Sequence, residues 1–207
     1  MTLRIFLFVF LALSPVAAQA AENNAPLEIS ADQALEWRRG TKEYVARGNV
    51  LARQGADDVR ADELVAHYTE NAGGSPTIHQ LVATGHVIMT TENGTAASKT
   101  IASDVLTVWL DPTSNGKGAM TRAEATGNVI ITTPKEHAIG SKAIYTKADD
   151  TAILDGPVTI TRGQDVLNGT RAVVNLKTGL STLYGGGNSG SRVTGVFYTG
   201  TAKKTAD

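Results

Sequence analysis

The chain has 207 residues, and its 19 Lys and Arg against 20 Asp and Glu give a formal net charge of -1. Because binding to nucleic acid needs a clustered excess of basic residues, this balance argues against nucleic acid as the main partner. The sequence contains no Cys, which excludes disulfides, thiolate nucleophiles and Cys-ligated zinc sites. Hydrophobic residues make up 42% and aromatic residues only 5%, a composition that predicts one domain with a core of small aliphatic side chains.

The N-terminal segment, residues 1–20, has the pattern of a secretory signal peptide. A basic start is followed by an apolar run from Ile5 to Leu13 and by small residues that end at Ala20. An uncleaved membrane anchor is the alternative, but the apolar run is too short to span a bilayer well and Pro15 interrupts the segment. We therefore predict cleavage after Ala20 and a mature protein that is soluble or attached only through partners.

Two short phrases recur along the chain, with the spacing that is typical of stacked repeats. The first phrase is Ala-x-Gly-x-Val, and its copies begin at Ala46, Ala83 and Ala125, with weaker copies at Leu154 and Leu183. The second phrase is apolar-x-small-polar-x-apolar, and it follows the first. Its copies cover 59–64, 101–106, 139–144 and 167–172, and 29–34 is a copy without a preceding first phrase.

Both phrases have the chemistry of β-strands. Val, Ile and Thr alternate between two faces after each glycine, and such β-branched residues favour strands over helices. The glycines are expected to start strands and to mark a bulge or a corner, and they are Gly48, Gly85, Gly127 and Gly156. The pattern as a whole predicts an all-β, repetitive antiparallel fold of about 14 to 17 short strands with almost no helix.

We expect the folded domain to cover residues 21–184. Residues 185–207 begin with a Gly-rich run, but no helix follows it, so a phosphate-binding loop is not expected there. A last short strand is predicted over 193–198, followed by a disordered tail.

No motif for catalysis or metal binding is present in the sequence. The four His residues lack metal-ligand spacing, and no Ser stands in Gly-x-Ser-x-Gly. Asp62 and Asp104 suggest a carboxylate pair, but they occupy one slot of the second phrase, where Lys142 and Thr170 stand in other copies. We interpret them as solvated or turn-capping residues. The sequence therefore predicts a protein without enzymatic activity, cofactor or metal.

The candidate site is the apolar face of the sheet itself. Two interpretations of this face stay open, an ordinary dry core between packed sheets or an interior that is accessible to an apolar ligand. From alternation along the strands, the side chains expected on this face are Val50, Ala52, Leu64, Val87, Met89, Leu106, Val129, Ile131, Ile144, Val158, Ile160 and Val173.

The segments 26–32, 44–50 and 59–64, in this order, resemble the start of the OstA-like family of periplasmic lipopolysaccharide-transport proteins. Later copies of the first phrase extend the resemblance over residues 26–184. It implies an open, twisted β-jellyroll (a β-taco) with a hydrophobic groove along its length. Lipopolysaccharide would keep the acyl chains of its lipid A in this groove and its sugars outside.

The resemblance also implies partners for the two ends of the sheet. Its terminal edge strands would pair head to tail with further copies of the chain, and with inner-membrane and outer-membrane transport components. A closed structural or adhesive β-solenoid, acting as a protein-interaction scaffold without lipid, is the alternative. A solenoid-type polysaccharide enzyme would need a carboxylate cluster on one exposed face, and the repeat slots supply none.

Overall fold

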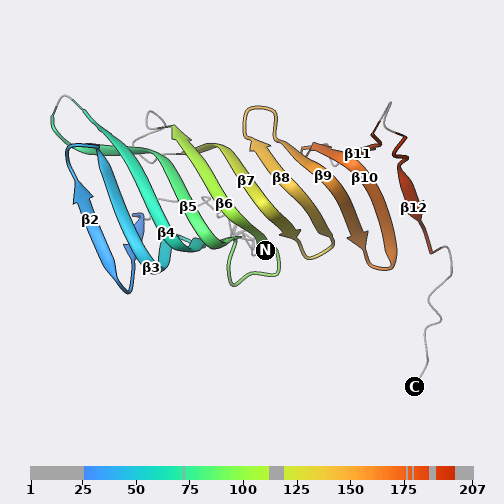
Figure 1. Ribbon diagram of the computed structural model, residues 1–207, viewed down its shortest axis with the longest axis horizontal. Helices are drawn as coiled ribbons and strands as arrows, with labels where there is room; N and C mark the ends of the chain where they lie inside the picture. The colour runs from blue at the N-terminus through green and yellow to red at the C-terminus, as the bar shows by residue number, and fades with distance from the viewer. Residues whose placement is uncertain are drawn as a thin grey trace, which may run out of the picture.

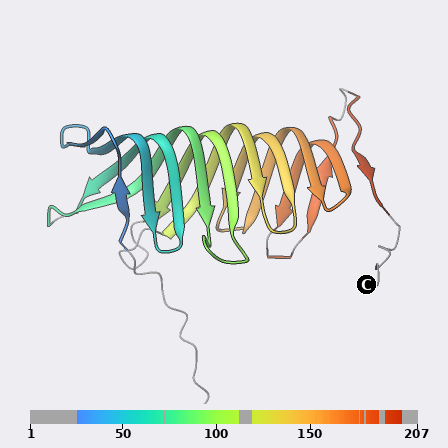
Figure 2. The same cartoon turned by 90° about the horizontal axis from the view of Figure 1, so that it is seen from below.

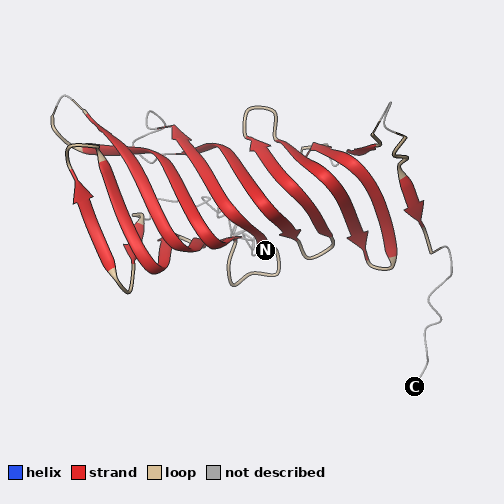
Figure 3. Ribbon diagram, viewed as in Figure 1, coloured by secondary structure: helices blue, strands red, loops and turns tan. Residues whose placement is uncertain are grey.

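The computed structural model describes residues 26–71, 73–111, 119–175, 177–178, 180–186 and 190–198. These residues form 12 β-strands in one antiparallel sheet (Figure 1), and they contain no helix (Figure 3). A helix long and apolar enough to cross a membrane is accordingly absent from the described part of the chain. The predicted signal peptide and the predicted tail from residue 199 onward lie outside the described residues.

The sheet order follows the chain from β3 to β10, because each long strand pairs with its neighbours in sequence. Figure 1 shows these strands side by side along the long axis of the molecule. The strands are β1 Glu28–Ser30, β2 Ala34–Arg38, β3 Glu43–Gln54, β4 Asp57–Glu70, β5 Pro76–Thr91, β6 Lys99–Asp111, β7 Ala119–Thr132, β8 His137–Thr146, β9 Thr151–Arg162, β10 Asp165–Asn175, β11 Ser181–Tyr184 and β12 Thr194–Val196.

The glycine of each Ala-x-Gly-x-Val phrase lies at a β-bulge, where the strand bends. In β5 the register shifts between Thr84 and Val87, and the two residues between them, Gly85 and His86, have φ angles of 78° and 45°. Glycine adopts such a positive φ without the steric cost that a Cβ brings. Equivalent register shifts occur in β3 and β7, so the predicted bulge is confirmed.

The predicted number of strands, about 14 to 17, is higher than the 12 that the described residues form. The reason is that the bulge glycine lies within a strand rather than at its start. Gly85, for example, lies inside β5, which has 16 residues. Residues on either side of the glycine were expected in separate short strands, whereas the bulge keeps them in one bent strand.

The bends fold the sheet over, so that each long strand contributes one half to each of two layers (Figure 2). The first layer begins at β1, which pairs with the C-terminal half of β3, and ends at β12, which pairs with the N-terminal half of β10. The second layer begins at β2 and ends at β11, which pair with the other halves of β3 and β10.

Neither end of the described sheet pairs with the other, so the sheet stays open rather than closing into a barrel. The prediction of an all-β, open antiparallel fold is therefore confirmed. The short strand β12 lies within the range 193–198 where a last strand was expected.

Candidate functional site

Apolar side chains line the inner face of the first layer. Register partners in neighbouring strands share a face of the sheet, so a row of side chains can be followed from strand to strand. From β1 to β9 this row consists of Ile29, Ala52, Val59, Met89, Ile101, Ile131, Ala138 and Ile160. All of them belong to one hydrophobic cluster or pack against it, and we call them the first-layer row.

The second layer carries a facing row in which Ala and Leu largely alternate. In register order it consists of Ala46, Leu64, Ala83, Leu106, Ala125, Ala143, Leu154, Ala172 and Leu183. These residues join the same hydrophobic cluster as the first-layer row. A small side chain beside a large one leaves space for interdigitation, so the two layers share one core.

At the bend this interior is closed. A valine stands two positions after each bulge glycine, and its exposed fraction is 0% or 1%. These valines are Val50, Val87, Val129 and Val158. Each is in register with a small residue of the next strand, and these are Ala61, Ser103, Gly140 and Gly169. A Cβ added to Gly140 would lie 2.6 Å from Cδ1 of Leu154, so the space above this glycine is filled. The bend therefore has a dry core.

Away from the bend the inner face is only partly buried. We call this part the accessible inner face, and its residues are Met89, Ile101, Ile131 and Ile160 of the first layer and Leu81, Leu110 and Met120 of the second. Met is flexible and polarisable, so it adapts to ligands of irregular shape. Apolar side chains of both layers are therefore partly exposed away from the bend.

All but two of the side chains predicted on the apolar face lie there. The buried ones are Val50, Ala52, Leu64, Val87, Leu106, Val129 and Val158, and the partly buried ones are Met89, Ile131 and Ile160. The first group packs within the core that supports the face. Only the partly buried side chains, Met89, Ile131 and Ile160, keep surface on the open side of the inner face.

Ile144 lies on the outer face, so its prediction as an inner residue was wrong. It is in register with Glu124, whereas its neighbour Ala143 packs against the core. The cause is an offset of one residue in the repeat. Gly140, and not Ser141, stands opposite Val129 in the way that Ser103 stands opposite Val87.

Val173 is also on the outer face, and its prediction as an inner residue was wrong because it lies one position beyond the end of the 167–172 copy. Its register partners are Ile153 and Thr182, whereas Ala172 is buried in the core. Gly169 is the small residue opposite Val158, and three positions further along the strand the inner residue is Ala172.

Several inner residues were missed by the sequence analysis. Val59 and Ile101 open the second phrase in their strands, so the repeat itself marked them. Leu154 and Leu183 open weaker copies of the first phrase, where Ala stands in the full copies. The repeat marked these two positions as well, because the residues that open the full copies, Ala46, Ala83 and Ala125, lie on the inner face.

The outer side of the bend carries a polar contact that repeats along the sheet. Asn49 donates from Nδ2 to Oδ2 of Asp32 at 3.1 Å, and Nδ1 of His86 lies 2.8 Å from Oδ2 of Asp62. The Asp62 side chain is 61% exposed. These contacts agree with the interpretation of this slot as solvated and capping. In β8 the slot holds Ser141, which lies against Gly156, rather than the predicted Lys142.

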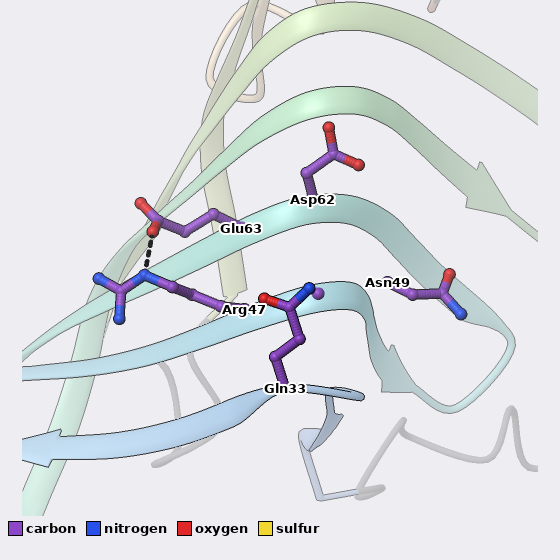
Figure 4. A pocket seen from close by; sticks show the side chains of 6 residues that line it. Gln33, Arg47, Asn49, Asp62 and Glu63 are labelled. Carbon is purple, nitrogen blue, oxygen red and sulfur yellow. Dashed lines mark hydrogen bonds and ion pairs between the residues drawn. The ribbon is translucent and has the colours of Figure 1, made fainter.

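A polar depression of about 320 Å³ lies at the outer side of the bend near β2 and β3 (Figure 4). Its lining residues are Gln33, Arg47, Gly48, Asn49, Asp62 and Glu63. Arg47 donates to Glu63 at 2.6 Å and also to Glu36. The hydrogen bond from Arg47 to Glu63 is the main cause that raises the pKa of Arg47. Charges in this depression are therefore already paired, and its polar lining does not extend the inner face.

Histidines in the described residues have separate neighbours. His67 lies 3.6 Å from Glu43, and His137 contacts Thr132 at 3.1 Å. No group of three or more metal-ligating side chains occurs in this part of the chain.

The family model of the LptA/(LptD N-terminal domain) LPS transport protein matches residues 28–180. The chain belongs to this family. One similar solved structure is LptH, the LptA homologous periplasmic component of the lipopolysaccharide transport device from Pseudomonas aeruginosa. It has 12% identity and a TM-score of 0.34, and the match covers 85% of this chain and 97% of that chain. No curated protein matches the chain.

The LptA/LptD family match begins in β1 and includes all of β10, whereas β11 and β12 lie beyond it. It therefore contains the whole first-layer row from Ile29 to Ile160. The part of the chain that defines this LPS transport family is the part that builds the accessible inner face.

Proposed function

We propose that this chain carries lipopolysaccharide across the periplasm, with the acyl chains of lipid A on the accessible inner face. The observation that carries the proposal is the first-layer row, which continues from Ile29 to Ile160 without a polar side chain. Membership of an LPS transport family supports the choice of cargo. The proposal includes cleavage of the signal peptide after Ala20, and it includes no enzymatic reaction.

The free-energy cost of exposing acyl chains to water explains why the cargo needs such an apolar row. An acyl chain of about a dozen methylenes costs on the order of 10 kcal/mol to leave in water, at about 0.8 kcal/mol per methylene. An apolar surface that runs across the strands would cover the chain over the whole length of the sheet. Similar aliphatic side chains along the row bind about equally well, so a lipid can advance without being held at one position.

The two open ends of the sheet support assembly with further copies. At one end Leu35 and Trp37 of β2 are 62% and 52% exposed, and at the other end Tyr184 and Val196 are 48% and 54% exposed. Unpaired strand edges with exposed apolar side chains favour strand addition.

Strand directions also fit a head-to-tail joint. In an antiparallel layer the direction alternates from strand to strand. Counted along the first layer, β12 runs opposite to β1, and along the second layer β11 runs opposite to β2. A second copy placed behind the first would therefore present β1 to β12 and β2 to β11 in antiparallel orientation. We propose that copies join in this way and that the outermost edges pair with inner-membrane and outer-membrane transport components.

Photo-cross-linking to labelled lipopolysaccharide tests the cargo and its position. Adjacent residues on opposite faces provide matched controls, because Ile130 and Ile88 are outer residues with 37% and 43% exposure. A photoreactive amino acid at Ile131 or Met89 should cross-link the lipid, and the same group at Ile130 or Ile88 should not. The buried Val87 is a poor position for this test, because a bulky group there would disrupt the core.

Two outcomes would contradict the proposal. Cross-links from the outer positions at the same yield as from the inner ones would mean that lipid does not occupy the inner face. Absence of cross-links at all four positions in folded protein, together with no lipid in solvent extracts of the purified chain, would favour the dry protein-interaction scaffold.

A further inference from the structure

The proposed cargo has a charged head as well as acyl chains. The sugars that bear the acyl chains of lipid A carry phosphate groups, which need charge-assisted hydrogen bonds where the apolar surface ends. An Arg with unpaired N–H donors is well suited to this role, because its planar guanidinium matches phosphate geometry. One Arg with this property lies at the N-terminal end of the described sheet.

Trp37 marks the end of the inner face in the second layer. It is in register with Tyr44, which is in register with the fully buried Ala66. The indole N–H donates to the hydroxyl of Tyr68 at 2.8 Å, and the indole ring stacks on Tyr44 with ring centroids 5.8 Å apart. The indole is therefore held in one orientation although half of its surface is exposed.

Arg39 lies on this fixed ring. Its Cζ is 4.2 Å from the centroid of the Trp37 ring, within the range of a cation–π interaction. No carboxylate among the described residues forms an ion pair with Arg39. Stacking on a rigid ring orients the guanidinium, and the lack of an ion pair leaves its donors available to an anion from solvent.

Nearby carboxylates are paired with other cations. Glu36 lies 2.7 Å from Arg38, and Glu70 lies 2.6 Å from Lys42. These pairs reduce the competition for the guanidinium of Arg39 from its own surroundings.

Two cations at other hairpins of the sheet differ from Arg39, because each forms an ion pair with a carboxylate. Lys99 lies 3.3 Å from Glu92, and Arg162 forms an ion pair with Glu136. Neither side chain lies over an aromatic ring of the described residues, whereas Arg39 combines a charge without an ion pair with an aromatic support at the end of the inner face.

We propose that Arg39, held on Trp37, binds a phosphate group on the sugar head of the lipid whose acyl chains lie on the accessible inner face. The inference rests on the proposed function and assigns the position of the head group to the turn between β2 and β3. Glycolipid phosphate and free phosphate share the same chemistry, so the test must separate them.

Displacement of an environment-sensitive apolar dye from the full mature chain measures the affinity for each ligand. The ligands are lipid A with both phosphates, lipid A from which both phosphates have been removed, and inorganic phosphate. Arg39→Gln removes the charge, and Arg39→Lys keeps the charge but loses the planar donor edge. Arg53→Gln is the matched control, because Arg53 is exposed on the outer face and contacts no aromatic ring among the described residues.

We expect Arg39→Gln to weaken binding of phosphorylated lipid A by about tenfold, the loss of one charge-assisted contact, and to leave the dephosphorylated lipid within about twofold. The affinity of Arg39→Lys for phosphorylated lipid A should lie between those of the wild type and Arg39→Gln. Arg53→Gln should have the affinity of the wild type. Inorganic phosphate alone should not displace the dye. In excess, it should weaken the binding of phosphorylated lipid A to the wild type.

If Arg39→Gln weakens the binding of both lipids equally, or of neither, the head-group assignment is overturned while lipid carriage stays intact. Displacement by inorganic phosphate alone, at the concentration needed for lipid A, would overturn it as well. If neither lipid displaces the dye from the wild type, the proposed function fails, and this inference fails with it.

Discussion

The carboxylate of Asp104 accepts two hydrogen bonds from the side-chain amide of Asn128, with Nδ2 3.2 Å from Oδ1 and 3.0 Å from Oδ2. This contact joins β6 to β7 on the outer side of the bend. It brings the Asp104 side chain directly over Gly127, where the backbone has a φ of 75°. The bend therefore depends on a glycine for two reasons, its backbone conformation and the space above it.

Gly127→Ala should destabilise the protein by about 2–4 kcal/mol, because positive φ and a close contact both penalise the added Cβ. That Cβ would lie 2.2 Å from Oδ2 of Asp104. Gly94→Ala is the matched control, because Gly94 also has a positive φ but no heavy atom within 4 Å of the added Cβ. Urea unfolding of both variants gives the difference, and equal losses would mean that the Asp104 contact is unimportant.

The assignment of faces in β8 predicts opposite results for two adjacent substitutions. Ala143→Asp places a carboxylate against the core and should cost more than about 3 kcal/mol in the free energy of unfolding. Ile144→Asp places it on the outer face near Glu124 and should cost about 1 kcal/mol or less. Thermal and urea unfolding would measure both. If Ile144→Asp lost more free energy of unfolding than Ala143→Asp, the assignment of Ile144 to the outer face would be contradicted.

Alternation along one strand predicts the faces of its side chains, but the register between two strands cannot be predicted from either strand alone. Val129 and Ile131 were predicted correctly because strict alternation continues from the bulge to the end of β7. Ile144 was not, since its face depends on which residue of β8 stands opposite Val129, and that register is a property of two strands. A shift of one residue reverses the face of every side chain that follows.

The site at the turn between β2 and β3 had no signal in the sequence. Trp37 contacts Tyr68 across 31 positions of the chain, and Arg39 is one of several exposed cations until this contact fixes the ring beneath it. The number of strands was overestimated for a related reason, because glycine predicts a change of direction but does not tell whether pairing stops or continues through a bulge.

Glu124 should make stability depend on pH. Hydrogen bonds from Lys142 first and Arg122 second hold the pKa of Glu124 below its ordinary range. A carboxyl with a lowered pKa in the folded state stabilises that state above the unfolded pKa, and the stabilisation is lost as pH falls through the folded value. Wild type should be more stable than Glu124→Gln by up to about 1 kcal/mol at pH 7, and this difference in the free energy of unfolding should shrink as pH falls below the ordinary Glu pKa of about 4.3.

Unfolding of both proteins by urea from pH 7 to pH 3 would measure this difference. A gap that stays constant over that range would show that the ion pairs of Glu124 with Lys142 and Arg122, at 2.5 Å and 2.6 Å, do not contribute through charge.

Removal of residues 187–207 should reduce self-association without reducing the binding of apolar dye. The truncated chain lacks β12, so its first layer would end at β10, which runs in the same direction as β1. The next copy would then meet a parallel edge in one layer and an antiparallel edge in the other. Analytical ultracentrifugation of the full mature chain and the truncated chain would compare their masses, with circular dichroism as the control for folding. Unchanged or stronger association after truncation would contradict the joint between β12 and β1.

Pairing between sequence neighbours has a consequence for how such proteins change in size. Each strand from β4 to β9 pairs only with the strands before and after it, so deletion or duplication of two consecutive strands among them would alter the span of the sheet by about 10 Å while both ends keep their polarity. Loss of a single strand would invert one end and spoil its fit to the next subunit. Evolution of this architecture should therefore proceed in hairpin-sized steps, and chain length should act as a ruler for the distance that one subunit bridges.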